Sequence, residues 1–136
     1  MMSADEASRA LGIELLEAGP GRAVARLRLT DGMINGHGVA HGGYLFLLAD
    51  TAFACACNSH GPAAVASSAE ITFVSPGRAG DELVAVAEER TRYGRNGIYD
   101  VTIFRELGDA REVLAEFRGR SRTIATGQPG SPSQVK

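Results

Sequence analysis

"NGHGVAHGGYLFLLAD", residues 35–50, joins a glycine-rich polar segment to the longest apolar run of the 136-residue chain. The run extends from Tyr44 to Cys57 and contains one charged residue, Asp50. It is shorter than the roughly 20 apolar residues that span a bilayer, so it predicts a buried core helix from about residue 42 to residue 59. Burying an ionised carboxylate without a partner costs several kcal/mol, so the position of Asp50 needs a physical reason.

The helical neighbours of Asp50 do not supply that reason. The positions three and four residues away hold Phe46, Leu47, Phe53 and Ala54, so no cation lies within reach on the same helix. Asp50 can face a water-filled cleft, meet a partner from elsewhere, or take part in acid–base chemistry. It can also be a buried structural aspartate that accepts hydrogen bonds from neighbouring backbone.

The glycine-rich segment favours chemistry. Gly42 and Gly43 open the predicted helix, where backbone N–H groups lack intrahelical partners and the helix dipole is positive. Such a helix end can bind an anion or a developing oxyanion, and glycine lets a ligand approach the backbone closely. Asn35, His37 and His41 add polar side chains beside it. The alternative is a tight turn with His41 as an ordinary first-turn residue, but together with Asp50 the segment indicates an acyl-transfer or hydrolytic site.

Metal and nucleotide-phosphate sites fit the sequence less well. His37, His41 and Asp50 could form a two-histidine, one-carboxylate set, but Gly-Val-Ala separates the two histidines in a predicted loop. Cys55 and Cys57 lie two residues apart on the predicted helix, where their side chains diverge and can neither pair nor share a metal. No Gly-Lys-Ser/Thr follows the glycines, as a phosphate-binding P-loop requires. We therefore predict no metal and no cofactor.

Composition sets the class of protein. The chain is 44% apolar and 22% charged with a net charge of −2, which is typical of a globular protein with no general attraction to nucleic acid or membranes. The acidic N-terminus lacks the pattern of a signal peptide, and the chain has no disulfide framework. These features predict a reducing, cytoplasmic location.

The rest of the chain predicts strands around the helix. A hairpin is expected at 12–30 with its turn at Gly19-Pro20-Gly21, and four further strands are expected at 64–74, 82–92, 98–107 and 112–125. Short connections force antiparallel pairing, and a helix that is apolar on nearly every face must be enclosed. The prediction is an α+β fold in which one curved antiparallel sheet wraps around one long central helix. Residues 1–126 form a single domain, and the low-complexity tail at 127–136 is expected to be disordered.

The segments 35–61, 63–85 and 93–101 resemble the hotdog-fold acyl-CoA thioesterases, most of all the phenylacetate-degradation branch of that family. The likeness covers about residues 10–125, and its most specific block is His-Gly-Gly followed by Leu-Ala-Asp. The resemblance implies a hotdog fold and hydrolysis of aryl-acetyl-CoA thioesters such as (hydroxy)phenylacetyl-CoA to the free acid and CoA. It also implies a cytoplasmic homotetramer, a dimer of dimers, with active sites shared between subunits.

The resemblance assigns roles to particular residues. Asp50 is similar to the catalytic carboxylate, as nucleophile or general base, and Gly42 to the backbone donor that holds the thioester carbonyl. Asn35 and His41 are similar to the polar residues that orient the thioester and its attacking water, with Gly43 next to them. Relatives also place a hydroxyl residue on the strand after the helix, for which Ser67 and Ser68 are the candidates here.

The phosphates of CoA require cations near the mouth of the site. Arg78 after the Val-Ser-Pro-Gly turn, and Arg92 and Arg95 around the Tyr-Gly-Arg-Asn-Gly turn, are the candidates, although any one of them can also be a solvated surface charge. Two other functions stay open at this point. One is a hotdog dehydratase or hydratase acting on acyl thioesters, and the other is a non-catalytic acyl-CoA-binding protein.

Overall fold

The computed structural model describes residues 5–124, so the predicted tail at 127–136 lies outside the described residues. The elements follow the predicted order of two strands, one long helix and four strands, preceded by a short helix. They are α1 (Glu6–Ala10), β1 (Glu14–Gly19), β2 (Arg22–Arg28), the 3-10 turn η2 (Asp31–Met33), α2 (Gly42–Cys57), β3 (Ala64–Phe73), β4 (Glu82–Tyr93), β5 (Asn96–Leu107) and β6 (Ala110–Thr123).

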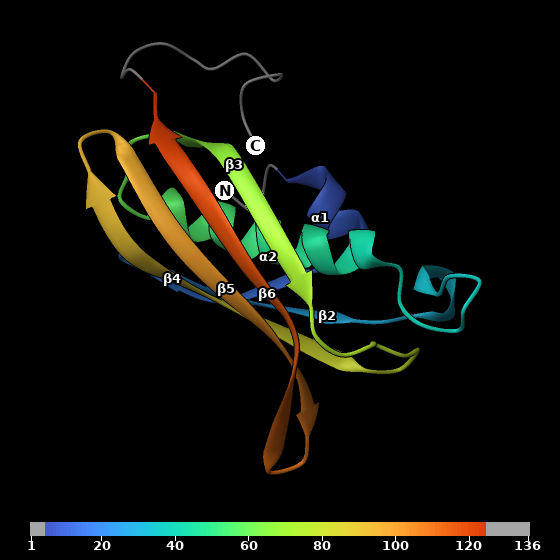
Figure 1. The fold of residues 1–136 in the computed structure, drawn as a ribbon. Coiled ribbons are helices and arrows are strands. Elements are labelled where there is room, and N and C mark those ends of the chain that lie inside the picture. The colour runs from blue at the N-terminus through green and yellow to red at the C-terminus, as the bar shows by residue number, and fades with distance from the viewer. Residues whose placement is uncertain (1–4, 125–136) are drawn as a thin grey trace.

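The six strands form one sheet in the order β1-β2-β4-β5-β6-β3, and every neighbouring pair is antiparallel. The sheet curves around α2, and the β5–β6 hairpin projects beyond the other strands (Figure 1). The prediction of a curved antiparallel sheet around one central helix is therefore confirmed. No helix within residues 5–124 is long and apolar enough to cross a membrane.

Small side chains on the sheet let α2 lie directly against it. Ala23 pairs with Ala87 and Ala25 with Ala85 across β2 and β4, and all four are fully buried. On the β5–β6 side the helix is met by larger groups, where the Phe53 ring packs 5.6 Å from Tyr99 and 5.9 Å from Phe117 between ring centroids. Close packing of this kind holds α2 in one position relative to the strands.

Side chains fix both ends of α2. At the N-terminus, the His41 ring accepts a hydrogen bond from the Gly43 N–H at Nδ1, 3.0 Å away. At the C-terminus, the Asn58 amide donates to the Ala54 carbonyl at 2.9 Å, and its oxygen accepts from the Ala64 N–H at 2.9 Å. The helix therefore ends at Cys57, two residues before the predicted end at residue 59, because Asn58 caps it and at the same time holds Ala64, the first residue of β3.

Gly119 of β6 is one of the tight points of this packing. A Cβ at Gly119 would lie 2.8 Å from three atoms of the Phe53 ring, which is itself buried and cannot move aside. We expect Gly119→Ala to lower the free energy of unfolding by about 1–3 kcal/mol through overpacking, measured by urea denaturation at fixed protein concentration. Gly19→Ala is the control, since a Cβ there meets nothing within 4 Å. Equal stability of the two variants would contradict this account of the core.

Candidate active site

The loop before α2 is folded by its own asparagine. The Asn35 side-chain oxygen accepts hydrogen bonds from the N–H groups of His37 at 2.9 Å and Val39 at 3.4 Å. The Asn35 N–H in turn donates to the Val39 carbonyl at 2.8 Å. Asn35 thus shapes the loop that precedes the helix, and His37 is exposed on it. Within residues 5–124 no three His, Cys, Asp or Glu side chains are grouped so that they could hold a metal ion.

His41 has a defined orientation at the start of α2. Its N–H donates to the Met33 carbonyl at 2.8 Å, and its ring accepts from Gly43 at Nδ1. Because Nδ1 is an acceptor, the neutral ring carries its proton on Nε2, which is then a donor. Gly42 is the first residue of the helix, so its N–H has no intrahelical partner. The helix end therefore offers hydrogen-bond donors to a bound oxygen.

An apolar cavity of about 380 Å³ adjoins Gly42. Its wall is built by the glycine loop, the first turn of α2 and the connection after β3, and only Ser75 contributes a polar side chain. The lining residues are Val39, Ala40, Gly42, Leu45, Phe73, Val74, Ser75, Pro76 and Gly77. A cavity with this lining suits an apolar group whose polar end is held at the helix N-terminus.

Asp50 lies in the middle of α2 and is only 7% exposed. It is eight residues after Gly42 on one continuous helix, which separates them by about 12 Å along the axis at about 1.5 Å per residue. The two predicted catalytic groups of one chain are therefore too far apart to act on one carbonyl.

The cysteines of α2 are not available as nucleophiles. Burial raises the pKa of the Cys57 thiol to about 12, and the charge of Asp50 acts in the same direction. Burial also raises the pKa of Cys55. Since the thiolate is the reactive form, both residues remain protonated near neutral pH.

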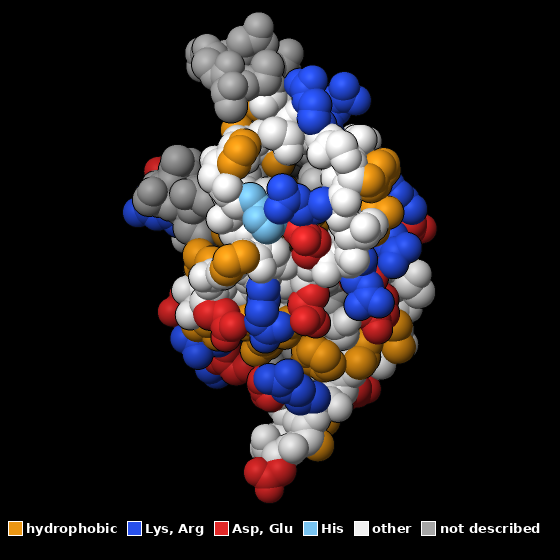
Figure 2. Space-filling model, turned by 90° about the vertical axis from the view of Figure 1, so that its left-hand side faces the viewer, with side chains coloured by type: hydrophobic (Ala, Val, Ile, Leu, Met, Phe, Trp, Pro, Cys, Tyr) orange, Lys and Arg blue, Asp and Glu red, His pale blue; other side chains and the backbone are white. Residues whose placement is uncertain are grey.

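The three candidate arginines lie near opposite ends of helix α2. Arg78 is next to the glycine loop, where its guanidinium lies 3.5 Å from the Gly38 carbonyl oxygen. Arg92 and Arg95 instead line a small polar cavity of about 40 Å³ near the C-terminal end of α2, beside His60 and Tyr99. Acidic, basic and imidazole side chains gather at this end of the molecule (Figure 2). One chain therefore does not bring Arg92 and Arg95 to Gly42.

A β-bulge decides the orientation of the candidate serines. The pairing of β3 with β6 shifts between Ala66 and Ser68, so Ser67 occupies the bulge, and its hydroxyl donates to the Arg120 carbonyl at 3.1 Å. Ser68 pairs with Arg120, two residues along β6 from Arg118, which lines a groove on the outer face. Alternation along β6 therefore places Ser68 on the sheet face away from α2. Ala66 is opposite the buried Ser121, so the position that faces the helix carries no hydroxyl on β3.

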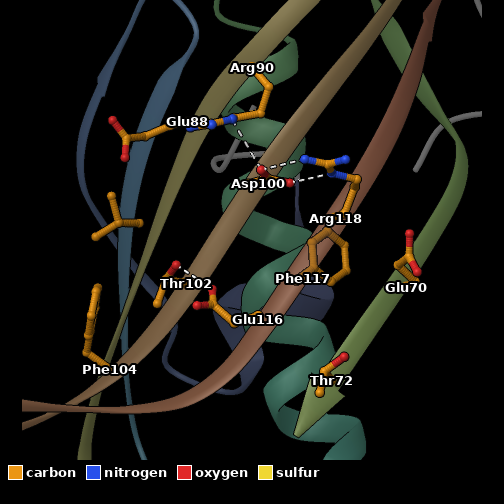
Figure 3. Close-up of a pocket in the computed structure, with 11 residues that line it drawn as sticks. Glu70, Thr72, Glu88, Arg90, Asp100, Thr102, Phe104, Glu116, Phe117 and Arg118 are labelled. Atoms are coloured by element: carbon orange, nitrogen blue, oxygen red, sulfur yellow. Dashed lines mark hydrogen bonds and ion pairs between the residues drawn. The ribbon is translucent and has the colours of Figure 1, made fainter. Parts of the chain in front are cut away.

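A larger cavity, about 560 Å³, lies on the outer face of the sheet (Figure 3). Both of its arginines pair with Asp100: Arg90 lies 3.3 Å from that carboxylate, and Arg118 makes two hydrogen bonds to it at 2.6 and 2.8 Å, which lowers the pKa of the carboxyl. Four acidic residues line it against two arginines, which is unfavourable for a polyanion such as CoA. It also contains no predicted site residue. The lining residues are Glu70, Thr72, Val86, Glu88, Arg90, Asp100, Thr102, Phe104, Glu116, Phe117 and Arg118.

Comparison with known proteins supplies the family. The Thioesterase superfamily profile matches residues 37–110, more than half of the chain, including Gly42 and Asp50. The chain is 46% identical over 124 residues to Acyl-coenzyme A thioesterase PaaI of Escherichia coli K12, covering 91% of this chain and 86% of that protein. The chain belongs to the thioesterase superfamily. The resemblance drawn from the sequence is confirmed.

Solved structures of this superfamily confirm the hotdog fold. The E. coli PaaI protein from the phenylacetic acid degradation operon superposes with a TM-score of 0.88, covering 92% of this chain and 88% of that one at 46% identity. A mutant of the phenylacetic acid degradation protein PaaI from Thermus thermophilus gives 0.82 at 36% identity, covering 88% and 100%. A family match assigns no role to single residues, so the roles of Asn35, His41, Gly42 and Asp50 stay predictions.

Sequence reasoning did not single out the apolar wall after β3. Phe73 and Val74 line the cavity beside Gly42, and both are more than half exposed. The sequence did contain a signal for this wall. Two large apolar residues follow one another at the end of a strand, directly before Ser-Pro-Gly, and alternation of side chains would leave one of them facing water.

We expect Cys55 and Cys57 to resist iodoacetamide in the folded protein at about pH 8, because the raised pKa of each thiol keeps the thiolate fraction very small. Both should react once the chain is unfolded in guanidinium, and intact-mass spectrometry counts the adducts. Rapid alkylation of the folded protein with loss of activity would contradict this conclusion and make a cysteine a candidate nucleophile.

Proposed function

We propose that this chain hydrolyses acyl-CoA thioesters, with aryl-acetyl-CoA esters such as (hydroxy)phenylacetyl-CoA as substrates. The observation that carries the proposal is an apolar cavity that opens beside the N–H donors of the α2 N-terminus. Similarity to the relative named acyl-coenzyme A thioesterase PaaI, and to PaaI proteins named for phenylacetic acid degradation, supports the substrate class.

The chemistry uses two groups. The Gly42 N–H holds the thioester carbonyl oxygen and stabilises the oxyanion that forms when the carbonyl carbon is attacked. Asp50 either removes a proton from the attacking water or attacks the carbonyl itself, in which case water then hydrolyses the acyl-aspartyl anhydride. In both routes the C–S bond breaks, the CoA thiolate takes up a proton, and the acid is released. His41 and Asn35 orient the thioester and the water.

The site is shared between two copies of the chain. The 12 Å helical separation of Gly42 from Asp50, about 1.5 Å for each of eight residues, supports this, because a base must lie within hydrogen-bond reach of the water that attacks the bound carbonyl. The exposed edge of β3 supports it too. β3 pairs only with β6 among the described strands, it is ten residues long, and its edge carries one charged residue, Glu70. The opposite edge strand, β1, is short, interrupted by a bulge and rich in glutamate, which protects it from pairing.

A two-fold dimer would use this edge twice. Pairing β3 with the same strand of a second copy extends both sheets and brings two α2 helices together in opposite directions. Each site would then combine Asn35, His41 and Gly42 of one subunit with the partner subunit's Asp50. Arg92 and Arg95, which lie at the far end of α2 in one chain, would come near the glycine loop of the other. Assembly of two such dimers into a tetramer is part of the proposal.

Asp50→Ala should keep its fold and lose about 10²–10⁴-fold in turnover of phenylacetyl-CoA, because the attacking group is removed. Release of free thiol is the measurement, and a dehydratase acting on the same thioester would release none. Asp109→Ala, in the exposed turn between β5 and β6, removes an equal charge and should be unaffected. If Asp50 only satisfies backbone groups, its loss should instead cost about 1–3 kcal/mol of stability while the folded fraction turns over normally.

Arg92→Ala combined with Arg95→Ala should raise KM for acyl-CoA with a smaller effect on kcat, because phosphate contacts remote from the carbonyl bind ground and transition states alike. An acyl-pantetheine, which lacks the nucleotide, should show no such increase. Arg28→Ala with Arg111→Ala removes the same charge from other exposed positions and controls for general electrostatic steering. An equal KM increase on both substrates would show that Arg92 and Arg95 do not contact the nucleotide.

Two inactive variants should restore activity when they form mixed dimers. Asp50→Ala and Asn35→Ala each damage one half of every shared site, so a mixed dimer has one site with both lesions and one with neither. Random pairing of the refolded chains should return about a quarter of wild-type thioesterase activity. Recovery no greater than the sum of the separate variants, with mixed dimers confirmed by native mass spectrometry, would mean that one chain builds each site.

A further inference from the structure

Phe73, the last residue of β3, lies against the first residue of α2. It pairs with Ala115 of β6, on the sheet face that packs on the helix. An ideal Cβ built on Gly42 would lie 2.7 Å from Phe73 Cζ and 3.1 and 3.3 Å from the two Cε atoms. The ring tip therefore occupies space that any side chain at position 42 would need, directly beside the proposed carbonyl donor.

The Phe73 ring belongs only partly to the core. It is 54% exposed although neighbouring concave-face residues such as Ala115 and Phe117 are buried. Its uncovered surface borders the apolar cavity, whose lining includes both Gly42 and Phe73. An exposed ring at the edge of an apolar cavity gains free energy when another apolar surface covers it, and an aromatic surface adds a geometry-dependent contribution.

Another part of the cavity wall, formed by Ala40, Pro76 and Gly77, is held in place. The Gly77 carbonyl accepts a hydrogen bond from the Ala40 N–H at 2.8 Å, which ties the connection after β3 to the glycine loop. Arg105 of β5 braces the same connection, with its guanidinium 2.7 Å from Asp81 Oδ2 and 3.4 Å from the Pro76 carbonyl. The cavity that the Phe73 ring borders thus has a fixed wall beside it.

We propose that Phe73 is a specificity-determining residue that selects aromatic acyl groups. With the thioester carbonyl at the Gly42 N–H, the group on the adjacent α-carbon enters the apolar cavity and stacks on the Phe73 ring. Gly42 then has two functions, since its N–H holds the carbonyl and its missing side chain admits the ring. The inference rests on the proposed thioesterase function and adds the residue that distinguishes aryl from alkyl substrates.

The experiment compares kcat/KM for phenylacetyl-CoA and hexanoyl-CoA in the same preparations. Phe73→Leu keeps an apolar side chain without a ring and should lower the aryl-to-alkyl ratio by about 2- to 10-fold, the scale of one aromatic contact. Phe73→Tyr keeps the ring and should leave the ratio near that of the wild type. Phe104→Leu, the same change at a ring on the outer face of the sheet, is the matched control and should leave the ratio unchanged.

Gly42→Ala provides a second, independent readout. The new Cβ forces the exposed ring to move, so the variant should lose aryl preference in addition to any general loss of rate. In the double variant with Phe73→Leu the ratio should be no lower than in Phe73→Leu alone, because one contact cannot be lost twice. Independent, multiplying effects on the ratio would contradict a shared contact.

The outcomes distinguish failure of the selective role of Phe73 from failure of the proposed thioesterase function. Equal losses on both substrates in Phe73→Leu, with wild-type melting temperature and oligomer mass, would overturn the selective role of Phe73 and leave the thioesterase function intact. Wild-type protein that releases no thiol from either ester, or from other acyl-CoA esters, would overturn both.

Discussion

The rigid length of α2 is the constraint on which the rest of the structure depends. The helix runs without a break from Gly42 to Cys57, buried against paired alanines on β2 and β4, and its Phe53 ring packs on the Tyr99 and Phe117 rings of β5 and β6. A helix packed this closely can neither bend nor unwind to bring Asp50 toward Gly42. The fold therefore keeps the proposed carbonyl-binding end of α2 and the proposed catalytic Asp50 apart within one chain, and a second copy is the simplest way to join them.

The polar residues at the helix N-terminus are organised before any substrate arrives. Asn35 accepts two backbone hydrogen bonds within its own loop, and His41 accepts one from Gly43. Each interaction satisfies a backbone donor that would otherwise need water. Each also fixes the orientation of the Asn35 and His41 side chains, which are proposed to orient the substrate. Oriented donors do not have to reorganise as charge develops on the carbonyl oxygen, which is the main benefit of such a site.

The sequence predicted the fold more completely than the site, for physical reasons. Turn residues such as Gly21, Gly94 and Gly108 adopt positive φ and mark the hairpins locally, and the apolar helix has only one way to be enclosed. Helix and strand boundaries that depend on a single side chain were harder to predict. Asn58, for example, ends α2 earlier than the apolar composition indicates. The bulge at Ser67 was not predicted, because a one-residue shift in pairing reverses the face of every following side chain without changing the composition of the strand.

Residues that meet only in three dimensions were the hardest to assign. Arg78, Arg92 and Arg95 are equivalent as sequence candidates, yet one lies by the glycine loop and two lie at the far end of α2. Phe73 was not recognised because its importance comes from its contact with Gly42, 31 positions earlier in the chain (73 minus 42). Cavity volume alone is a poor guide to the site, since the 560 Å³ cavity on the outer face has an acidic lining, whereas the smaller cavity beside Gly42 joins apolar walls to N–H donors. A thioester needs an apolar site for its acyl group and a donor for its carbonyl oxygen, and the cavity beside Gly42 combines the two.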